Sequence, residues 1–578
     1  MNHALCAVQI NLVNADYTAG PGEVTQLSVA SPALATTASL NANTGALSTF
    51  AGQGDAITVD KTFTLTGESQ GTRIIAIPTG TQGNLTVKAV VDGATSTVPV
   101  TLNQPFVQGK AYVVNLKVKD AKTPVELISV TVKEWTEEQL GDFDSYPIKP
   151  DNKFIYKVAL PTNDTEFLAT FRGFTGTIDW GDGTEPTTHV NENNPEHTYT
   201  DAGTYTITMS IDNNSWIGNN GFGIYAQYIT DIMYIGSDVA KNITSMASSF
   251  SNTKIKKIRK GLFDKCTNVI YFPSTFAACD ELTEIPAGLF DKCTEAKSFF
   301  NTFSNCKKLK EIPVGFFSKC TKAENFGSTF RGCSSLTTIP NIFAGCTNVT
   351  TFEETFSDCT SLTSLAAGLF DSCTQLSSYR SFRLTFSNCT SLTELPVGLF
   401  NHCTKATEFW GTFERCGGLK KVPRIFDGCT GVTKFTNTFK ECRGLTEITQ
   451  GLFDGCPNVT DFYQTFYKCT SLISVPQIFD NCTEVTKFEY TFNGCGALKS
   501  ISEKLFDACT KVTRFFWTFA GCMELTGESP YTLVNGVKVH LYERKNYTEF
   551  FATPEESNYC FGNCYDLTDF NNIPRKWR

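Results

Sequence analysis

One pattern of apolar and polar positions repeats along the chain from residue 250 to residue 522. Its first half, half A, reads Leu-Phe-x-x-Cys-Thr-x-Val-x-x-Phe, and its second half, half B, reads Thr-Phe-x-x-Cys-x-x-Leu-x-x-Ile-Pro. The full unit spans 26–27 residues and is stretched to 30 once. A fixed period of this length predicts a solenoid, because a single unit cannot bury its apolar face without neighbours.

Each unit predicts one coil made of strand, turn, strand and turn. Phe and Cys three residues apart lie on one face of a single helical or 3₁₀ turn, so both side chains point inward. The Val-x-x-Phe and Leu-x-x-Ile segments that follow are short and β-prone. Pro286 and Pro313 end a strand, and Gly288 allows the next turn. About ten coils at a strand spacing of about 4.8 Å give a rod about 50 Å long.

The pattern accounts for 20 of the 23 cysteines, and Cys6, Cys560 and Cys564 lie outside it. Cysteines 13–14 residues apart lie on opposite walls of a coil, too far apart for a disulfide. Cysteines 26–27 residues apart stack one above another with side-by-side Cβ vectors, so disulfides in alternate pairs would distort the ladder. We therefore expect free, buried thiols that act as small apolar groups and weak donors to neighbouring backbone.

Short β-prone runs separated by Gly, Asn, Thr and Pro fill residues 1–142. Examples are Ala7–Leu12, Leu85–Val91 and Tyr112–Val118. Closely spaced runs of this kind predict an antiparallel β-sandwich. Cys6 precedes the first run without the apolar and small residues that precede a lipidated cysteine, so we interpret it as a strand cysteine.

Residues 143–235 predict a second β unit. A strand at Gly176–Ile178 enters Asp179-Trp180-Gly181-Asp182-Gly183-Thr184, an Asp-Gly turn that favours positive φ. His197-Thr198-Tyr199 and the alternating strand Thr204–Ile207 follow. Asp179, Asp182 and His197 admit a metal-site interpretation; the favoured one is that Asp182 caps its own turn and Tyr199 packs in the core.

Three resemblances follow from these motifs. The block Phe106-Val-Gln-Gly-Lys-Ala-Tyr112, with Ile128–Lys133 ending at Trp135, resembles the last strands of the fimbrillin family (FimA/Mfa-like), and His3-Ala4-Leu5 resembles an internal strand of it. This implies a surface domain lacking the family's N-terminal portion, with its lipidation and pro-segment. The W-G-D-G…H-T-Y…G-x-Y constellation resembles the PKD-type β-sandwich, which implies a spacer.

The pattern F-x-x-C-x-x-L-x-x-I resembles the BspA-type leucine-rich repeats of bacterial surface proteins. The resemblance implies a mainly β fold, with N-terminal β-sandwich domains followed by a leucine-rich-repeat solenoid of about ten 26–27-residue coils with short helical or 3₁₀ turns. The period fails after Cys522, and Thr253 stands where a cysteine is expected. Three extra residues around Tyr379–Leu384 are expected to bulge one coil outward. The predicted division is 1–142 fimbrillin-like, 143–235 PKD-like and N-terminal cap, 236–522 repeats, and 523–578 C-terminal cap.

Charge, histidine content and the absence of catalytic motifs exclude several classes of function. The chain has 49 Lys and Arg against 58 Asp and Glu, a net charge of −9, which argues against nucleic-acid binding. Five scattered histidines predict no metal site, and no cofactor motif is present. The sequence has no G-x-S-x-G, P-loop, C-x-x-C or H-E-x-x-H motif, and we interpret Glu353-Glu354 as part of a solvated face, so an enzyme is not predicted. The chain has no run of 18 apolar residues and starts without a signal peptide, so secretion would require a leader absent from this chain.

One column of coil positions is a candidate binding surface. The position seven after each half-A cysteine should point away from the core, and aromatic residues recur there and at the next position. The candidates are Phe300, Trp410, Tyr463, Tyr490, Phe516 and Trp517. An exposed aromatic row would recognise protein or glycan, whereas ordinary cross-strand packing is the alternative. Two residues earlier, Glu408, Lys434, Asp461, Lys487 and Arg514 mostly alternate in sign, which predicts a stabilising charge ladder.

Two functions remain after these exclusions. The favoured one is a non-enzymatic adhesin on the outer surface of a Gram-negative bacterium, which binds a host or bacterial surface protein or glycan and meets the membrane only through a lipid anchor or partner absent from this chain. The other is a structural pilus or fimbria subunit that polymerises through the fimbrillin-like domain. Glycan hydrolysis would need a carboxylate pair in a cleft, and no such pair is identified.

Overall fold

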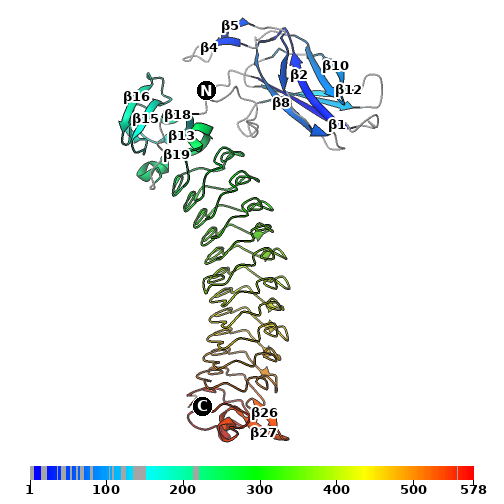
Figure 1. The fold of residues 1–578 in the computed structure, drawn as a ribbon, viewed down its shortest axis with the longest axis vertical. Coiled ribbons are helices and arrows are strands. Elements are labelled where there is room, and N and C mark those ends of the chain that lie inside the picture. The colour runs from blue at the N-terminus through cyan, green and yellow to red at the C-terminus, as the bar shows by residue number, and fades with distance from the viewer. Residues whose placement is uncertain are drawn as a thin grey trace. The chain divides into compact units, whose positions relative to one another are not determined.

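The computed structural model describes residues 6–14, 23–35, 37–40, 47–51, 55–59, 63–64, 70–78, 83–102, 105–106, 110–118, 125–134, 152–212, 221–555 and 558–578. The described structure is mainly β, with few helices. The chain divides into two compact units, residues 1–149 and 150–578 (Figure 1). Residues 3–5, 107–109 and 135, which carry part of the fimbrillin resemblance, lie outside the described residues.

The first unit contains two five-stranded sheets around one core. The first has the order β12-β11-β1-β8-β3; in the second, β10-β9-β2-β6, strand β7 also pairs with β2. Alternate residues of β1, Val8, Ile10 and Leu12, are buried in a core that both sheets share. The strands are β1 Cys6–Asn14, β2 Glu23–Ala30, β3 Leu34–Ala35, β6 Ile57–Val59, β7 Phe63–Thr64, β8 Gln70–Pro78, β9 Leu85–Val91, β10 Ala94–Val100, β11 Lys110–Val118 and β12 Val125–Glu134, with a separate pair β4 Thr37–Leu40 and β5 Leu47–Ala51.

One pairing departs from the predicted antiparallel sandwich. Strands β1 and β11 run parallel, with Ala7 opposite Ala111. Parallel neighbours need a long crossover connection, and here the chain between them supplies strands of both sheets. The β1 strand begins at Cys6, as the strand interpretation of that cysteine requires.

The second unit begins with a module of two sheets, which we call the sheet module (residues 152–235). Its larger sheet has the order β16-β15-β18-β13-β19, and β14 pairs with β17 beside it. The elements are β13 Lys153–Leu160, β14 Thr165–Leu168, β15 Phe174–Asp179, β16 Thr187–Glu192, β17 Glu196–Tyr199, β18 Gly203–Ile211, the 3₁₀ helix η2 Gly223–Tyr228 and β19 Ile229–Ile235, followed by the short helix α1 Ser237–Ala240.

The turn after β15 is held by its own side chains. Asp182 Oδ1 accepts a hydrogen bond from the backbone N–H of Thr184 at 3.0 Å, and Tyr199, which is buried, donates its hydroxyl to the carbonyl of Trp180 at 2.9 Å. His197 Nε2 lies 2.7 Å from Asp182 Oδ2, with its ring stacked on Trp180. The predicted capping and core roles of Asp182 and Tyr199 are confirmed.

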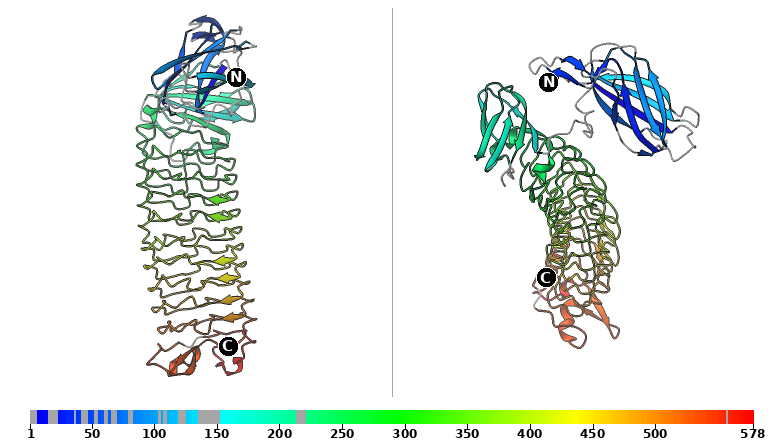
Figure 2. Two further views of the ribbon diagram at one scale, coloured as in Figure 1. Left: turned by 90° about the vertical axis from the view of Figure 1, so that its right-hand side faces the viewer. Right: turned by 45° about the horizontal axis from the view of Figure 1, so that its top comes forward.

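From residue 245 to residue 527 consecutive segments lie side by side in register; we call this part the stacked repeat. Two ladders of parallel bridges join the segments, one running through half A and one through half B. The half-A ladder includes Ser245, Tyr271, Ser298, Asn325 and Thr351, and it continues from Glu408 through Lys434, Asp461, Lys487 and Arg514. The half-B ladder contains the two-residue strands β20 Thr338–Ile339, β21 Ser364–Leu365, β22 Lys421–Val422, β23 Glu447–Ile448, β24 Ser474–Val475 and β25 Ser500–Ile501, which line one edge of the stack in Figure 2.

The Phe-x-x-Cys segments form single turns instead of helices. The backbone N–H of Cys266 donates to the carbonyl of Phe263 at 2.9 Å, and the same i to i−3 bond recurs in later coils. One such bond closes a turn but does not propagate, because the β-prone segment follows at once. The i to i−3 bond is that of a single 3₁₀-type turn, so the predicted short turns are found as isolated turns.

Stacked phenylalanine rings fill the core. In the half-B row, from Phe276 to Phe561, successive ring centroids lie 5.4–5.7 Å apart with planes within 9°. This row continues from the last coil into the C-terminal residues, and one hydrophobic cluster extends from Phe154 in the sheet module to Trp577. The sheet module, the stacked repeat and most of the C-terminal residues therefore share one core, beside which Val534, Val539 and Phe551 form a small separate cluster.

The cysteines connect each coil to the one before it. All 22 cysteines whose side chains are described are free and buried. In half B, each thiol donates to the carbonyl of the half-B phenylalanine of the preceding coil, as from Cys416 to Phe386 at 3.1 Å. Burial raises the pKa of Cys416 to about 12. The prediction of free, buried thiols that donate to neighbouring backbone is confirmed for these residues.

The threonine of each Thr-Phe pair makes a second link, which the sequence analysis missed. Thr412 is fully buried and its hydroxyl donates to the carbonyl of Phe382 in the preceding coil at 2.9 Å. Equivalent bonds run from Thr302 to Phe272 and from Thr465 to Phe435. Thiol, hydroxyl and backbone donors therefore all fix the same register between coils.

The last coil is covered by residues 528–578. These comprise the hairpin β26 Tyr531–Val534 and β27 Val537–His540 and the 3₁₀ helices η3 Leu541–Asn546 and η4 Phe570–Asn572. Arg544, only 1% exposed, donates from Nη1 to the carbonyl of Cys509 at 2.9 Å and from Nη2 to that of Phe506 at 3.0 Å. In inner coils the equivalent carbonyls accept hydrogen bonds from the next coil. At the end of the stack the Arg544 guanidinium supplies these donors.

Candidate binding surface

Every coil has a left-handed residue two positions before its half-B phenylalanine. Six of these twelve positions hold Ser, Asn or Gly, residues that tolerate positive φ better than bulky ones do. Three consecutive positions near the C-terminal end instead hold Tyr490, Trp517 and Tyr559, with φ of 57°, 56° and 58°. The earlier occupants are Ser248, Ser274, Asn301, Ser328, Glu354, Leu384, Gly411, Asn437 and Gln464.

These three rings and Tyr463 form a continuous surface, which we call the aromatic strip. Tyr463 meets Tyr490 edge to face with centroids 5.9 Å apart, and Tyr490 stacks on Trp517 at 6.1 Å with planes 9° apart. Trp517 contacts Tyr559 at 5.1 Å. Tyr463 and Tyr490 are half-buried, whereas Trp517 is 38% and Tyr559 51% exposed. The strip therefore presents rings supported by one another and open to solvent along one side.

Charged groups flank the strip. Asp461 Oδ1 accepts the backbone N–H of Tyr463 at 2.8 Å, and burial raises the pKa of the Asp461 carboxyl. Arg514 lies 3.7 Å from Glu489 and 3.1 Å from Glu555. Burial also raises the pKa of Glu489. The strip thus combines apolar ring area with hydrogen-bonding groups at its border.

The predicted charge ladder lies beside the strip. Parallel bridges join Glu408 to Lys434 and continue through Asp461 and Lys487 to Arg514. Lys434 Nζ pairs with Glu408 Oε1 at 2.9 Å, and this contact raises the pKa of Lys434. The geometry fits cross-strand stabilisation.

The structure brings together only part of the predicted aromatic row. Phe300 is 46% exposed but lies several coils away, against Gly327. Trp410 is half-buried and carries Arg383 over its ring at 4.7 Å. Phe516 is half-buried, and its carbonyl accepts the N–H of Tyr490 at 2.8 Å. Tyr463, Tyr490 and Trp517 alone of the six candidates are shown in mutual ring contact within the described structure.

Tyr559 is a member of the strip that the sequence analysis missed. It lies in the C-terminal residues, where counting from half-A cysteines fails. Counting back two residues from a half-B phenylalanine places Tyr559 before Phe561 just as Trp517 stands before Phe519. That offset is the signal that finds it.

A second surface feature lies where one coil is longer. Phe382 stacks in its core row between Phe352 and Phe409, and Leu384 takes the left-handed position with φ 54°, so the extra residues are 378–380. Ser381 occupies the half-A ladder position of this longer coil, because its carbonyl accepts the N–H of Phe352 at 2.8 Å. The expected outward bulge is found, as 377–380 are all exposed.

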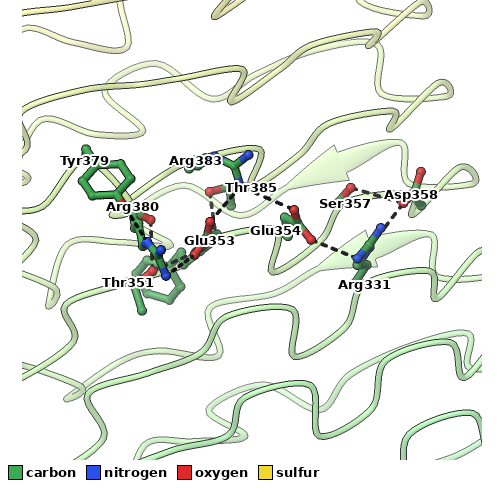
Figure 3. A network of polar contacts seen from close by, with 11 residues as sticks. Arg331, Thr351, Glu353, Glu354, Ser357, Asp358, Tyr379, Arg380, Arg383 and Thr385 are labelled. Atoms are coloured by element: carbon green, nitrogen blue, oxygen red, sulfur yellow. Dashed lines mark hydrogen bonds and ion pairs between the residues drawn. The ribbon is translucent and has the colours of Figure 1, made fainter. Parts of the chain in front are cut away.

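Ion pairs connect this bulge to neighbouring coils (Figure 3). Arg383 Nη1 lies 2.8 Å from Glu353 Oε1 and 3.6 Å from Glu354 Oε1. Arg331 Nη1 lies 3.0 Å from Glu354 Oε2. Arg380 reaches Glu353 only at 3.7 Å. The carboxylates Glu353 and Glu354, expected to be solvated, are instead enclosed between arginines.

One constellation of catalytic residue types, formed by Ser529, His540 and Asp569, has a structural role. Ser529 Oγ lies 2.8 Å from His540 Nδ1 and donates to Asp569 Oδ2 at 2.5 Å, but Ser529 is 1% exposed. A hydroxyl that is buried and already bonded to the carboxylate cannot reach a substrate.

No group of three or more His, Cys, Asp or Glu residues suited to a metal ion occurs in the part of the chain that the structure describes. In the same described ranges, no helix has the length and apolar character required to cross a bilayer.

A family model matches the N-terminal part of the chain. Residues 1–135 match the fimbrillin-like family model. No curated protein matches the chain.

Solved structures with some similarity include two candidate cell adhesion proteins, from Bacteroides uniformis (20% identity, 23% of this chain, 52% of that chain) and Bacteroides ovatus (16%, 23% and 46%), each with a TM-score of 0.19. The chain thus spans about half the length of these two proteins. A TLR13–ssRNA13 complex matches 58% of this chain and 76% of that chain, with 10% identity and a TM-score of 0.10. The part of the chain that carries a family match, residues 1–135, is fimbrillin-like.

Proposed function

We propose that this protein is a non-enzymatic adhesin of the outer surface of a Gram-negative bacterium, which recognises protein or glycan through the aromatic strip. In this proposal the stacked repeat is a BspA-type leucine-rich-repeat solenoid that carries the strip near its C-terminal end. The fimbrillin-like match supports a surface location, and three module types without an identified catalytic site support a binding role.

The observation that carries the proposal is the residue choice at the left-handed position. Nine coils show that the backbone accepts Ser, Asn or other residues there, so the fold does not require an aromatic side chain. A bulky residue at positive φ costs about 1–2 kcal/mol. Retaining three of them in adjacent coils, with their rings in contact and open to solvent, is explained by recognition. Tyrosine and tryptophan are also the residues enriched at interface hot spots.

The proposal divides the chain as the sequence does: 1–142 fimbrillin-like, 143–235 PKD-like spacer and N-terminal cap, 236–522 repeats and 523–578 C-terminal cap. It needs no cofactor. Membrane attachment in this proposal is through a lipid anchor or a partner.

The test is a glycan and extracellular-matrix protein array probed with the full chain. Trp517→Ala and Tyr490→Asn should each weaken capture by roughly tenfold or more, about 1.4 kcal/mol. Phe300→Ala, an exposed aromatic outside the strip, is the matched control and should leave capture unchanged. Equal capture by the strip variants, with unfolding curves like that of the original chain, would contradict the assignment.

A structural pilus or fimbria subunit is the second candidate, favoured by the fimbrillin-like match itself. It would polymerise through the fimbrillin-like domain. Electron microscopy and size-exclusion chromatography distinguish the two functions. A protein that stays monomeric and forms no fibres would exclude the pilus or fimbria subunit.

A further inference from the structure

The three residues that lengthen one coil are not required by the fold. The other coils of the stacked repeat pass from half A to half B without them, as from Cys346 to Cys359. Removing residues 378–380 from the sequence leaves Cys373 thirteen residues before Cys389 and every core position in register. The insertion therefore adds surface without adding core.

The inserted segment is held in one conformation. The backbone N–H of Ser378 donates to Ser381 Oγ at 3.1 Å, and that of Arg380 donates to Ser378 Oγ at 3.2 Å. Thr351, in the preceding coil, donates its hydroxyl to the carbonyl of Arg380 at 3.0 Å. A loop ordered before binding loses less conformational entropy when a ligand arrives.

The segment presents one aromatic ring and one guanidinium to solvent. Tyr379 is 54% exposed, and its hydroxyl accepts a hydrogen bond from Arg380 Nε at 2.8 Å. The Arg380 side chain is 57% exposed, and its 3.7 Å separation from Glu353 Oε2 is too long for a hydrogen bond. A guanidinium has five N–H donors, so most of those on Arg380 remain open to a ligand.

The charges around the segment cancel. Arg331, Arg380 and Arg383 alternate with Glu353, Glu354 and Asp358 in Figure 3, and the ion pairs between them hold the carboxylates in place. A balanced cluster exerts little net field on a charged partner. It does offer closely spaced donors and acceptors beside an aromatic ring.

We propose that the 378–380 insertion is a binding site for a neutral oligosaccharide, separate from the aromatic strip. The Tyr379 ring contacts the apolar C–H face of a pyranose, and Arg380 with Glu353 hydrogen-bonds its hydroxyls. A polyhydroxylated, uncharged ligand matches a site with open hydrogen-bonding capacity and no net charge. A protein partner is less suited, since a standard interface covers about 800 Å² on each side and the insertion adds only three exposed residues.

Isothermal titration of the full chain with cellohexaose, maltohexaose, xylohexaose and mannohexaose tests the site. At least one should bind, with an affinity that changes little between low and high salt. Deleting residues 378–380 restores the regular coil, so this variant should fold and lose roughly tenfold or more in affinity. Tyr379→Ala and Arg380→Ala keep the loop length and should each weaken binding. They provide the test if the deletion variant fails to fold.

Phe300→Ala, an exposed aromatic outside both the insertion and the aromatic strip, is the matched control and should bind the same sugar unchanged. The site is overturned if none of the four hexasaccharides binds, if binding survives the deletion, or if the insertion variants affect only heparin or protein capture. Because strip variants and insertion variants are separate, failure here leaves the proposed function of the strip intact, and the reverse is also true.

Discussion

The buried thiols should make the second unit unstable in mild alkali. Burial raises the pKa of Cys333 and Cys416 to about 12, whereas an unfolded thiol titrates near about 8.5. Above about pH 8.5 the unfolded chain loses thiol protons that the folded chain keeps, so the contribution of these groups to stability is fully present below that pH and is lost as the pH rises toward about 12.

The magnitude is large because the effect repeats in every coil. At one pH unit above 8.5, each buried thiol costs about 1.4 kcal/mol of unfolding free energy. A coil with two thiols loses about 3 kcal/mol, and a few coils together lose as much as the whole stability of an ordinary domain, about 5–15 kcal/mol. We therefore expect the stacked repeat to unfold between about pH 9 and pH 10.

The assay is a pH titration under reducing conditions that follows circular dichroism and thiolate absorbance together. Both signals should change in one transition, and returning the sample to neutral pH should reverse it. Replacing Cys306, Cys333 and Cys442 by threonine, the residue that occupies this position naturally at Thr253, should move the transition to higher pH. Thiolate absorbance that rises before any loss of structure, or structure that persists through about pH 11, would refute the reasoning.

Three further predictions concern contacts between coils. Arg544→Met leaves the carbonyls of Phe506 and Cys509 without their donor and should cost about 3 kcal/mol, seen as faster hydrogen exchange confined to the last coils; exchange like that of the original chain would contradict its capping role. Thr412→Val removes the buried bond to Phe382 and should cost about 1 kcal/mol in urea unfolding, whereas Thr433→Val, at a half-buried position, should cost clearly less. Lys434→Met removes a partly exposed ion pair and should cost at most about 1 kcal/mol, an effect that high salt abolishes; a larger loss would show that the ladder does more than stabilise the surface.

The core of the stacked repeat was predictable because its determinants are local. Phe and Cys three residues apart define a turn, and the constant spacing between turns places equivalent residues above one another. The role of Thr412 was not predictable in this way, because its acceptor, the Phe382 carbonyl, reaches it only when two coils stack. The parallel pairing of β1 with β11 joins residues about a hundred positions apart, and no local pattern specifies such a pair.

The candidate site was predictable in part for the same reason. Counting from half-A cysteines finds Tyr463, Tyr490 and Trp517, but it also selects Phe300 and Trp410, because a column position says nothing about which neighbouring coils carry aromatic residues. The left-handed backbone at Tyr490 and Trp517 has no sequence signature, because neither residue type favours positive φ.

The side-chain links between coils also determine how the second unit responds to force. Each coil is bonded only to its neighbours, so tension applied at one end loads the bonds of the outermost coil first. When that coil opens, its 27 or so residues lengthen from a rise of about 5 Å to a span of about 90 Å. The stack would then extend in equal steps and absorb mechanical work at each one, while the coils that remain closed keep their register.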